Sequence, residues 1–472
     1  MDRFLFKRKS NAKTVPPKAP KKKSYEEEIV SSDEDLSGTE GHHAENNEYE
    51  DVQTKAHRQA KELLKSLEEE TKNEETGEID DDAIAHRLQE DALAKVNRLQ
   101  RQIADFVNRF DSWADQKSFS PHRYSVLAAV LCPEQKYFVS CGKDGTIAKG
   151  RSHLLLVQSS FLVEIESNQV VSRIQYHRKN SDNHTGGVTA LAISPDGKWL
   201  VSGGADNVVK IWDFSTFRLA HNFLGHRGPV TSLTFRLGSS AELFSGSKDR
   251  TVKAWNLDQF GYVDTSYGHQ DSVNQIDMLS KERVLSVGSH DKTARFWKID
   301  TESQLIFNGH KHSISIDTCS MINDDHFVTG CADGSVSVWS AFKKKPISTV
   351  QEAHGQTNGK ANWIVSVAAA QFTDLVVSGS CDGWIRFWKV STDYKVIKPV
   401  GKVLQKGFIN DLRFSHKEFA LVVAVGQEHK SGRWWKLPEA RNSVIFMELT
   451  FKDKKDTSDE YTDESEVEID MM

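Results

Sequence analysis

Residues 225–256, GHRGPVTSLTFRLGSSAELFSGSKDRTVKAWN, decide the fold of this chain. Short runs of β-branched and aromatic residues alternate with Gly, Ser and Asp turns, which is typical of short antiparallel strands. Three positions mark the unit: His226, then Asp249 after 23 residues, then Trp255 after six more. If this pattern recurs at a fixed period, the chain is built from repeated sheets rather than from one continuous core.

The spacing does recur along the chain. An aspartate lies six residues before an anchor position in six units: Asp144 before Gly150, Asp206 before Trp212, Asp249 before Trp255, Asp291 before Trp297, Asp333 before Trp339, and Asp382 before Trp388. A histidine precedes each aspartate: His122, His184, His226, His269, His310 and, after a small insertion, His354. A further 47 residues after the sixth anchor lead to Trp435, which we interpret as the anchor of a seventh unit.

These units resemble WD repeats, in which a blade is bounded by Gly-His and Trp-Asp pairs. The pairs Gly225-His226, Gly268-His269, Gly309-His310 and Trp212-Asp213 carry the resemblance. A single four-stranded blade cannot bury both of its faces, so blades stack radially and close a ring. We therefore expect an all-β fold, a seven-bladed WD-repeat β-propeller over residues 120–450.

The resemblance also implies a structural tetrad of His, Ser or Thr, Asp and Trp in most blades. Three tetrads are expected to be His184, Ser202, Asp206 and Trp212; His226, Ser245, Asp249 and Trp255; and His310, Thr329, Asp333 and Trp339. The hydroxyl falls four residues before the aspartate, and the fourth unit has Val287 there, so its tetrad is expected to be incomplete. Because these residues repeat in register, we interpret them as structural and not as a hydrolase triad. No catalytic residue, cofactor or metal site is expected.

The first unit departs from the pattern. Gly150 occupies its anchor position, and the next anchor lies 62 residues further on. The apolar residues 151–163 look inserted, either as an extra strand or as a product of a variant transcript or misjudged exon boundary. The outer strand of this blade is then expected at residues 166–171.

The segments outside the propeller are segregated by charge. Residues 1–23 carry nine Lys/Arg and one acid, residues 24–50 carry ten acids and no Lys/Arg, and the segment from Lys452 has nine acids and three lysines. Blocks of like charge stay solvated, which predicts disordered tails over 1–52 and 452–472. The basic arm is either a nuclear import signal or merely solvated.

Residues 53–110 are expected to form a helical extension. Its second helix has an apolar stripe from Ile84 to Phe106 with steps of three and four residues, which is typical of an amphipathic helix. The stripe would pack either on the propeller or on a partner protein. Five cysteines without a C-x-x-C pair, and no apolar run long enough for a membrane span, favour a soluble intracellular protein.

The last repeat carries the most specific strings: GFINDLRFS at 407–415, GQEHKSGRWW at 426–435 and EARNSV at 439–444. With RLQED at 87–91 and EAHG at 352–355, they resemble the family of U3 small nucleolar RNA-interacting WD-repeat proteins. The resemblance implies a non-catalytic RNA-binding scaffold of the nucleolus, bound to the box B/C element of U3 small nucleolar RNA. The implied neighbours are a kink-turn-binding protein, other box C/D core proteins and small-subunit processome proteins, which together support pre-rRNA processing toward 18S rRNA.

Basic side chains in the last repeat are the candidates for contacts with phosphate, because such contacts require Lys, Arg or a protonated His on an ordered surface. The candidates are His429, Lys430, Arg433, Lys436 and Arg441, with Trp434 available to stack on a base. Trp434 should face away from Trp435, since strand neighbours alternate; the alternative is that it packs between blades.

Two further basic groups are the loop Lys343–Lys345 and the set Arg87, Arg98 and Arg101. Either group could contact RNA or be a solvated surface. The competing function is a protein–protein scaffold, such as a ubiquitin-ligase substrate receptor or a chromatin adaptor.

Overall fold

The computed structural model describes residues 98–106, 117–151, 170–174, 182–309, 313–357, 359–415 and 420–449, together with Arg58, Lys61, Arg87 and Leu88. The chain divides into two units, Met1–His86 and Arg87–Met472. In the first unit, Arg58 and Lys61 are helical. The predicted charged tails, most of the predicted helical extension and most of the predicted insertion at 151–163 lie outside the described residues.

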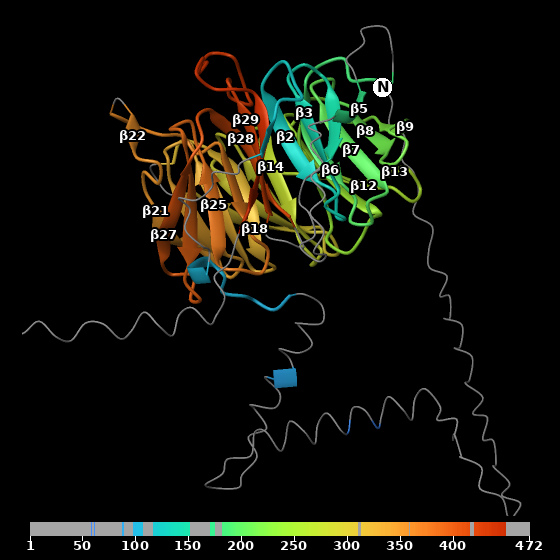
Figure 1. Cartoon of the computed structure of the whole chain (residues 1–472). Coiled ribbons are helices and arrows are strands. Elements are labelled where there is room, and N and C mark those ends of the chain that lie inside the picture. Colours follow the sequence, from blue (N-terminus) through green and yellow to red (C-terminus); the bar gives the residue numbers. More distant parts are fainter. Residues whose placement is uncertain are drawn as a thin grey trace, which may run out of the picture. The chain divides into compact units, whose positions relative to one another are not determined.

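Seven four-stranded antiparallel sheets make up the second unit (Figure 1). The strands of the first four blades are β2 (Val126–Leu131), β3 (Tyr137–Gly142), β4 (Ile147–Arg151) and β5 (Val170–Ile174); β6 (Val188–Ile193), β7 (Trp199–Gly204), β8 (Val209–Asp213) and β9 (Leu219–Phe223); β10 (Val230–Phe235), β11 (Glu242–Ser247), β12 (Thr251–Asn256) and β13 (Gly261–Tyr267); and β14 (Val273–Met278), β15 (Arg283–Gly288), β16 (Thr293–Lys298) and β17 (Ser303–Asn308). The last three blades contain β18 (Ile316–Asn323), β19 (His326–Cys331), β20 (Val336–Ser340) and β21 (Lys343–Val350); β24 (Ser366–Ala369), β25 (Leu375–Gly379), β26 (Trp384–Val390) and β27 (Ile397–Leu404); and β28 (Phe408–Phe414), β29 (Ala420–Gly426), β30 (Ser443–Glu448) and β1 (Lys117–Phe119).

The first strand of each sheet lies at the centre of a closed ring. β2, β6, β10, β14, β18, β24 and β28 contact one another in that order, and β28 returns to β2. This confirms the predicted seven-bladed propeller. A small hairpin of β22 (Gln356–Thr357) and β23 (Lys360–Ala361) occupies the insertion that the long spacing after His354 predicted.

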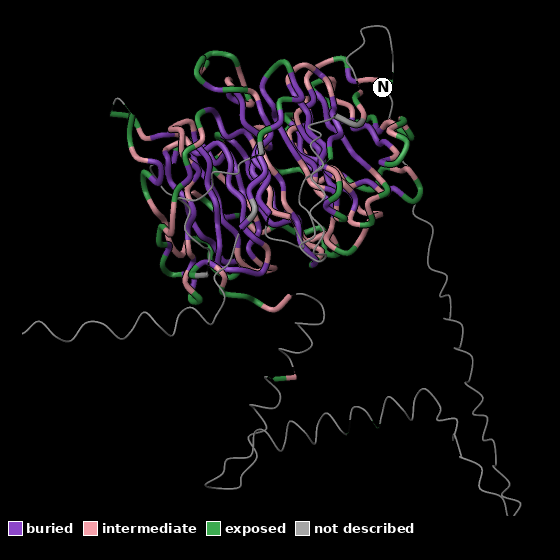
Figure 2. The backbone as a smooth tube through the Cα atoms, viewed as in Figure 1, coloured by how far each residue is buried: buried purple, intermediate pink, exposed green. Residues whose placement is uncertain are grey.

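Burial decreases from the inner strands to the outer strands, as Figure 2 shows. The second strands are covered by neighbouring blades on both faces; β29, ALVVAVG, is buried along its whole length. Outer strands have one edge in solvent, and β17, SQLIFN, buries one residue of six. Continuous apolar runs therefore mark inner strands, and mixed sequences mark outer ones.

Blade 7 is closed by the strand that precedes blade 1. β1 pairs antiparallel with β30, with Phe119 opposite Val444. Phe119 and Phe446 of this blade pack on Phe138 of β3 in blade 1, with ring centroids 5.3 and 4.8 Å from the Phe138 ring. The three-residue β1 carries no periodic signal of its own, so this closure was not predicted from the sequence.

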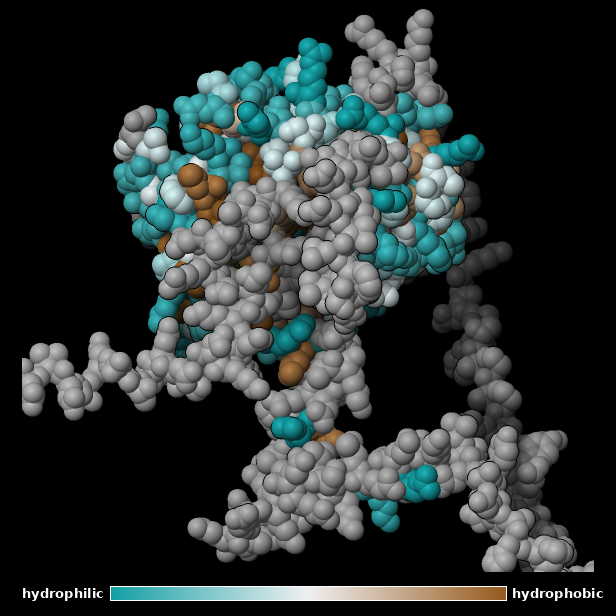
Figure 3. Space-filling view, viewed as in Figure 1, coloured by the Kyte–Doolittle hydropathy of each residue, from teal (hydrophilic) through white to brown (hydrophobic). Residues whose placement is uncertain are grey.

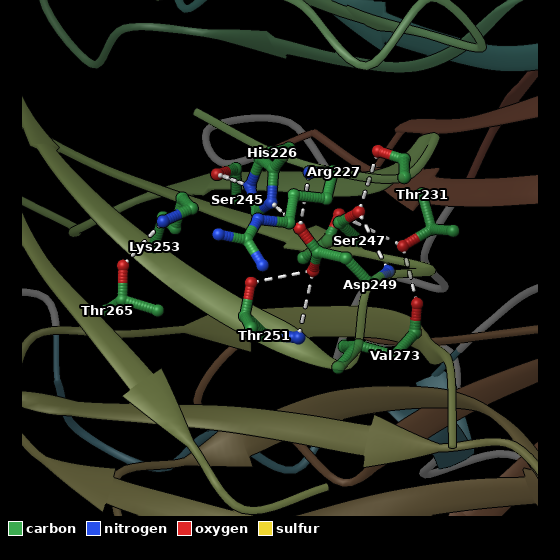
Figure 4. A network of polar contacts seen from close by, with 12 residues as sticks. His226, Arg227, Thr231, Ser245, Ser247, Asp249, Thr251, Lys253, Thr265 and Val273 are labelled. Atoms are coloured by element: carbon green, nitrogen blue, oxygen red, sulfur yellow. Dashed lines mark hydrogen bonds and ion pairs between the residues drawn. The ribbon is translucent and has the colours of Figure 1, made fainter. Parts of the chain in front are cut away.

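The tetrads form hydrogen-bonded chains inside the blades; Figure 4 shows His226, Ser245 and Asp249 of the blade 3 tetrad. The Nδ1 atom of His226 is 2.8 Å from Asp249, its Nε2 is 2.7 Å from the Ser245 hydroxyl, and Trp255 Nε1 donates to that hydroxyl at 2.7 Å. Burial raises the pKa of Asp249, but hydrogen bonds from His226 and Thr251 outweigh it and hold that pKa below its usual value.

Blades 2 and 6 repeat these contacts. His184, Ser202, Asp206 and Trp212 form the same chain in blade 2. In blade 5, Trp339 Nε1 donates to Thr329 at 2.9 Å, and Asp333 accepts from Ser335, while His310 lies outside the described residues.

The tetrad of blade 4 is complete, so the expectation based on Val287 was wrong. Ser286, five residues before Asp291, supplies the hydroxyl: it lies 2.7 Å from His269 Nε2 and accepts from Trp297 Nε1 at 2.7 Å. The turn of this blade is one residue longer, and the extra residue lies between the second strand and the aspartate. The hydroxyl is fixed by its pairing with the third strand and not by its distance from the turn.

Replacing Ser286 by Ala is expected to lower the free energy of unfolding by about 1–3 kcal/mol, because it leaves two buried donors or acceptors without a partner. Urea unfolding followed by tryptophan fluorescence measures this change. Ser245→Ala in blade 3 is the matched variant and should cost a similar amount. A loss below about 0.5 kcal/mol for Ser286→Ala alone would contradict a complete tetrad in blade 4.

Trp435 is not the anchor of blade 7, contrary to the interpretation of the 47-residue spacing. β29 ends at Gly426 and β30 begins at Ser443, so Trp435 lies in the loop between them. Val423 pairs with Ile445 where blade 3 pairs its tetrad hydroxyl residue Ser245 with Lys253, which places Met447 at the anchor position. The long loop happens to carry a tryptophan at the repeat distance.

In blade 1 a large side chain on the neighbouring strand fills the space that the anchor tryptophan fills in other blades. Gly150 pairs with Phe138, whereas in blade 2 Trp212 pairs with Leu200. A Cβ on Gly150 would lie 2.4 Å from the Phe138 ring, so the phenyl group fills the space that an anchor side chain fills elsewhere. The outer strand β5, described over Val170–Ile174, pairs with β4 and overlaps the end of the predicted 166–171, whose first four residues lie outside the described residues.

The C-terminal part of the predicted second helix is not helical. Arg87 and Leu88 are helical, but residues 98–103 are not, and a single 3₁₀ turn follows at Ala104–Phe106. The backbone amides of Ile103 and Ala104 donate to Asp374, and Ala104 is buried against blades 6 and 7. These tertiary contacts override the helical spacing, and this part of the stripe packs on the propeller.

Candidate functional site

The loop 427–442 between β29 and β30 is the long connection of blade 7, and it has an ordered backbone. Leu437 N donates to the Gln427 carbonyl at 2.8 Å, and the Gln427 side chain donates to the Ala440 carbonyl at 2.8 Å. Glu428 and Lys436 form an isolated antiparallel bridge. The loop is therefore a folded projection of the blade, visible as the red loop at the top of Figure 1.

Lys143, in a turn of blade 1, fastens this loop to the propeller. Its ammonium donates to the carbonyls of His429 and Gly432, both at 2.7 Å, and lies 3.2 Å from the Glu428 carboxylate. Burial lowers the pKa of Lys143, and Glu428 opposes that effect. A partly buried charge held by three acceptors fixes the position of the loop relative to blade 1.

Arginine and tyrosine side chains line the side of the loop that faces blade 1. The Arg433 guanidinium lies 5.4 Å from the centre of the Tyr124 ring, with its Nε 3.6 Å from Glu428. Arg123 lies 5.7 Å from the same ring. Cation–π contacts of this kind hold the guanidinium groups close to the surface while leaving their donors accessible.

The two tryptophans of the loop are both on the surface. Trp434 is 65% exposed, and its ring is nearly parallel to that of Trp363, with centroids 6.5 Å apart. Trp435 is 43% exposed and packs edge-on against Phe408. The expectation that one of them would enter the blade core was wrong, because both belong to a loop and not to a strand.

The His429 side chain is inside the molecule. It is 2% exposed, stacks on Trp363 with centroids 4.1 Å apart, and its Nε2 has no hydrogen-bond partner among the described residues. Burial and the neighbouring Lys430 and Lys143 lower its pKa to about 3. A neutral, buried imidazole does not contact phosphate; instead, it supports the aromatic surface.

Lys430 points toward acids of the inner strands. Burial lowers its pKa, opposed by the charges of Asp411 and Asp317 on β28 and β18. Of the six candidate residues, Arg433, Trp434, Lys436 and Arg441 are exposed in one loop. Lys143, Tyr124 and Trp363 were not predicted from the sequence, because their roles depend on contacts between blades.

The described residues do not present an accessible nucleophile in the tetrads. The Ser245 hydroxyl is fully buried and is already bonded to His226 and Trp255. Within the described ranges, no group of three His, Cys, Asp or Glu side chains could hold a metal ion. In the same part of the chain, no helix has both the length and the apolar character needed to cross a membrane.

A cavity of about 530 Å³ lies at the opposite end of the ring axis, among the turns that join first and second strands. It is lined mainly by apolar residues, such as Leu237 and Phe414. Burial raises the pKa of Asp277 in its wall, and that carboxylate accepts hydrogen bonds from the Met278 and Met321 amides. The basic and aromatic side chains of the candidate site are thus at the other end of the propeller.

Comparisons with known proteins agree with this architecture. The model of the family "WD domain, G-beta repeat" matches residues 113–148, 177–213, 217–256, 261–298, 301–340 and 345–389. These matches cover blades 1–6 and leave out the divergent blade 7, apart from its closing strand β1.

Relatives match most of the chain. U3 small nucleolar RNA-interacting protein 2 of Homo sapiens is 37% identical, over 85% of this chain and 82% of that protein. Ribosomal RNA-processing protein 9 of Saccharomyces cerevisiae is 25% identical, over 81% and 82%. A solved structure described as "Structure of U3-55K" is 39% identical, with a TM-score of 0.66 over 71% of this chain and 99% of that one.

Proposed function

Since this chain belongs to the family of U3 small nucleolar RNA-interacting WD-repeat proteins, we propose that it is a non-catalytic RNA-binding scaffold of the U3 small nucleolar ribonucleoprotein. Its ligand is the box B/C element of U3 small nucleolar RNA, next to a kink-turn-binding protein and other box C/D core proteins. The assembled particle acts in the nucleolus with small-subunit processome proteins, in pre-rRNA processing toward 18S rRNA.

The loop 427–442 is the observation that carries this proposal. It presents arginine and lysine side chains beside two exposed indoles on a backbone fixed by Lys143. Single-stranded and looped RNA is recognised by stacking of unpaired bases on aromatic rings together with charge contacts to phosphate. Trp434 offers the stacking surface, and Arg433, Lys436 and Arg441 offer the positive charge.

The contacts that hold the loop side chains favour recognition of a specific RNA element over general charge attraction. Arg433 is held between Tyr124 and Glu428, so its guanidinium plane has a defined direction. A planar guanidinium with a fixed direction selects a phosphate or base edge better than a freely moving lysine does. Gly432 permits the arrangement, because a Cβ there would lie within 2 Å of the Trp434 ring.

Binding of the full chain to a box B/C hairpin, with the kink-turn protein present, tests the proposal. Replacing Arg433 and Arg441 by Ala together should weaken binding about tenfold and reduce the slope of log K against log salt by about 1–2, because two phosphates are no longer neutralised. Ultraviolet crosslinking should place uridines on peptides from residues 427–442.

Arg218 and Arg227, exposed on blades 2 and 3, serve as the matched control pair. Their replacement by Ala removes the same charge and should change hairpin affinity less than twofold. Equal losses for both pairs would indicate general charge attraction. If hairpin binding and crosslinks were both absent in the presence of the kink-turn protein, RNA binding would be refuted and a protein–protein scaffold would be favoured.

A further inference from the structure

The outer strands of the blades differ sharply in charge. β21 reads KKKPISTV and β27 reads IKPVGKVL; together they contain five lysines and no acidic residue. In contrast, β9 reads LAHNF and β17 reads SQLIFN, without a lysine or an arginine. We call the five side chains the lysine rim: Lys343, Lys344, Lys345, Lys398 and Lys402.

The lysine rim is exposed and continuous across two blades. All five lysines are exposed, and β21 contacts β27 (left side of Figure 1). None of the five has an ion pair with an acidic side chain in the described ranges, whereas the nearby Lys395 is paired with Asp393 and Lys406 with Glu439. Figure 3 shows mainly hydrophilic side chains along this margin.

The positive charge of the lysine rim is unfavourable unless an anion lies close to it. Five like charges on two adjacent strands repel one another, and counterions that gather there are released when a polyanion binds. Phe342, next to the first lysine, is 79% exposed, and Lys402 lies 4.5 Å from the Trp384 ring centre.

We propose that the lysine rim binds the phosphate backbone of a helical RNA segment without reading its sequence. This inference rests on the proposed function only in taking RNA as the ligand. Lysine ammonium groups act as point charges and do not form the planar bidentate contacts that read bases. Double-stranded RNA is bound chiefly by its shape and its phosphates, which suits such a surface.

The rim and the loop 427–442 are separate surfaces. The rim lies on the outer strands of blades 5 and 6, whereas the loop connects the second and third strands of blade 7. Each rim strand has eight residues and spans about 26 Å, enough to follow several successive phosphates. The propeller therefore holds a specific RNA element with one surface and a helical arm with another.

The test compares two RNA probes on the full chain: a plain 30-base-pair RNA duplex, and the box B/C hairpin with the kink-turn protein. A variant in which Lys343, Lys345, Lys398 and Lys402 are replaced by Gln should bind the duplex about tenfold more weakly. The salt slope of duplex binding should decrease by about 2–4, since each phosphate that is no longer neutralised lowers it by at most about one. Hairpin affinity should stay within twofold.

A control variant replaces four lysines of blades 1–4 by Gln: Lys136, Lys198, Lys248 and Lys281. It changes the net charge equally and should leave duplex binding within twofold. Unchanged duplex binding by the rim variant, an equal loss in the control, or crosslinks from the rim to an acidic protein and not to RNA would each overturn the assignment. Loss of hairpin binding through Arg433 and Arg441 is measured separately, so the two proposals fail independently.

Discussion

Replacing Phe138 by Ala is expected to lower the free energy of unfolding by about 3–5 kcal/mol, because a fully buried phenyl group is removed. Phe138 is 1% exposed and packs on Phe119 and Phe446 across the seam between blades 1 and 7. The cavity also opens beside Gly150, which has no side chain to fill it. Urea unfolding measures the loss.

A pair of exchange variants tests the reason for this loss. Gly150→Trp alone should destabilise the protein by about 1–3 kcal/mol, since its Cβ would overlap the Phe138 ring. Gly150→Trp with Phe138→Leu copies the Leu200–Trp212 pair of blade 2 and should recover most of that loss. If Gly150→Trp alone were neutral, Phe138 would not be filling the anchor space.

Replacing Lys143 by Met is expected to weaken binding of the box B/C hairpin by about 10- to 100-fold. Hydrogen bonds to a charged group contribute about 1.5–3 kcal/mol, and 1.4 kcal/mol corresponds to a factor of ten. Met retains much of the volume but leaves the carbonyls of His429 and Gly432 and the Glu428 carboxylate without their donor. The loop 427–442 then loses its fixed position, although Lys143 does not itself contact RNA in the proposed function.

Two measurements separate positioning from direct contact. Lys143→Arg keeps the charge and should restore part of the affinity by bonding to at least one carbonyl. The salt slope of hairpin binding should stay unchanged in Lys143→Met, because the same phosphates are still neutralised. A slope reduced by about one would instead indicate that Lys143 contacts phosphate directly.

The repeat pattern predicted blades 1–6 correctly because the turn aspartate and its histidine recur in each of them, with the anchor tryptophan in blades 2–6. The histidine and the anchor tryptophan must bond to one hydroxyl while the turn aspartate bonds to the histidine, and this fixes their spacing. The spacing gave wrong predictions in the two blades where distances along the sequence do not follow the strand pairing. In blade 4 an extra turn residue moved the aspartate away from Ser286, and in blade 7 a long loop placed Trp435 at the repeat distance by coincidence.

The candidate site could be found in part from its sequence. The loop 427–442 stood out because its basic and aromatic residues do not belong to the repeat. Its support could not be found, because Lys143 lies 285 or more residues from its partners and resembles any other turn lysine. The burial of His429 likewise depends on Trp363 from the loop before blade 6.

The closing strand β1 has a consequence for the order of events during synthesis. Blade 7 needs β1 from one end of the propeller and β30 from the other, so it is completed only after the last strand has left the ribosome. Contacts between residues so distant in sequence form late, because their loop entropy must first be overcome. The loop 427–442 belongs to this last blade, so the surface proposed to hold RNA arises only in a finished ring. A partly made chain thus lacks this surface because of its own topology.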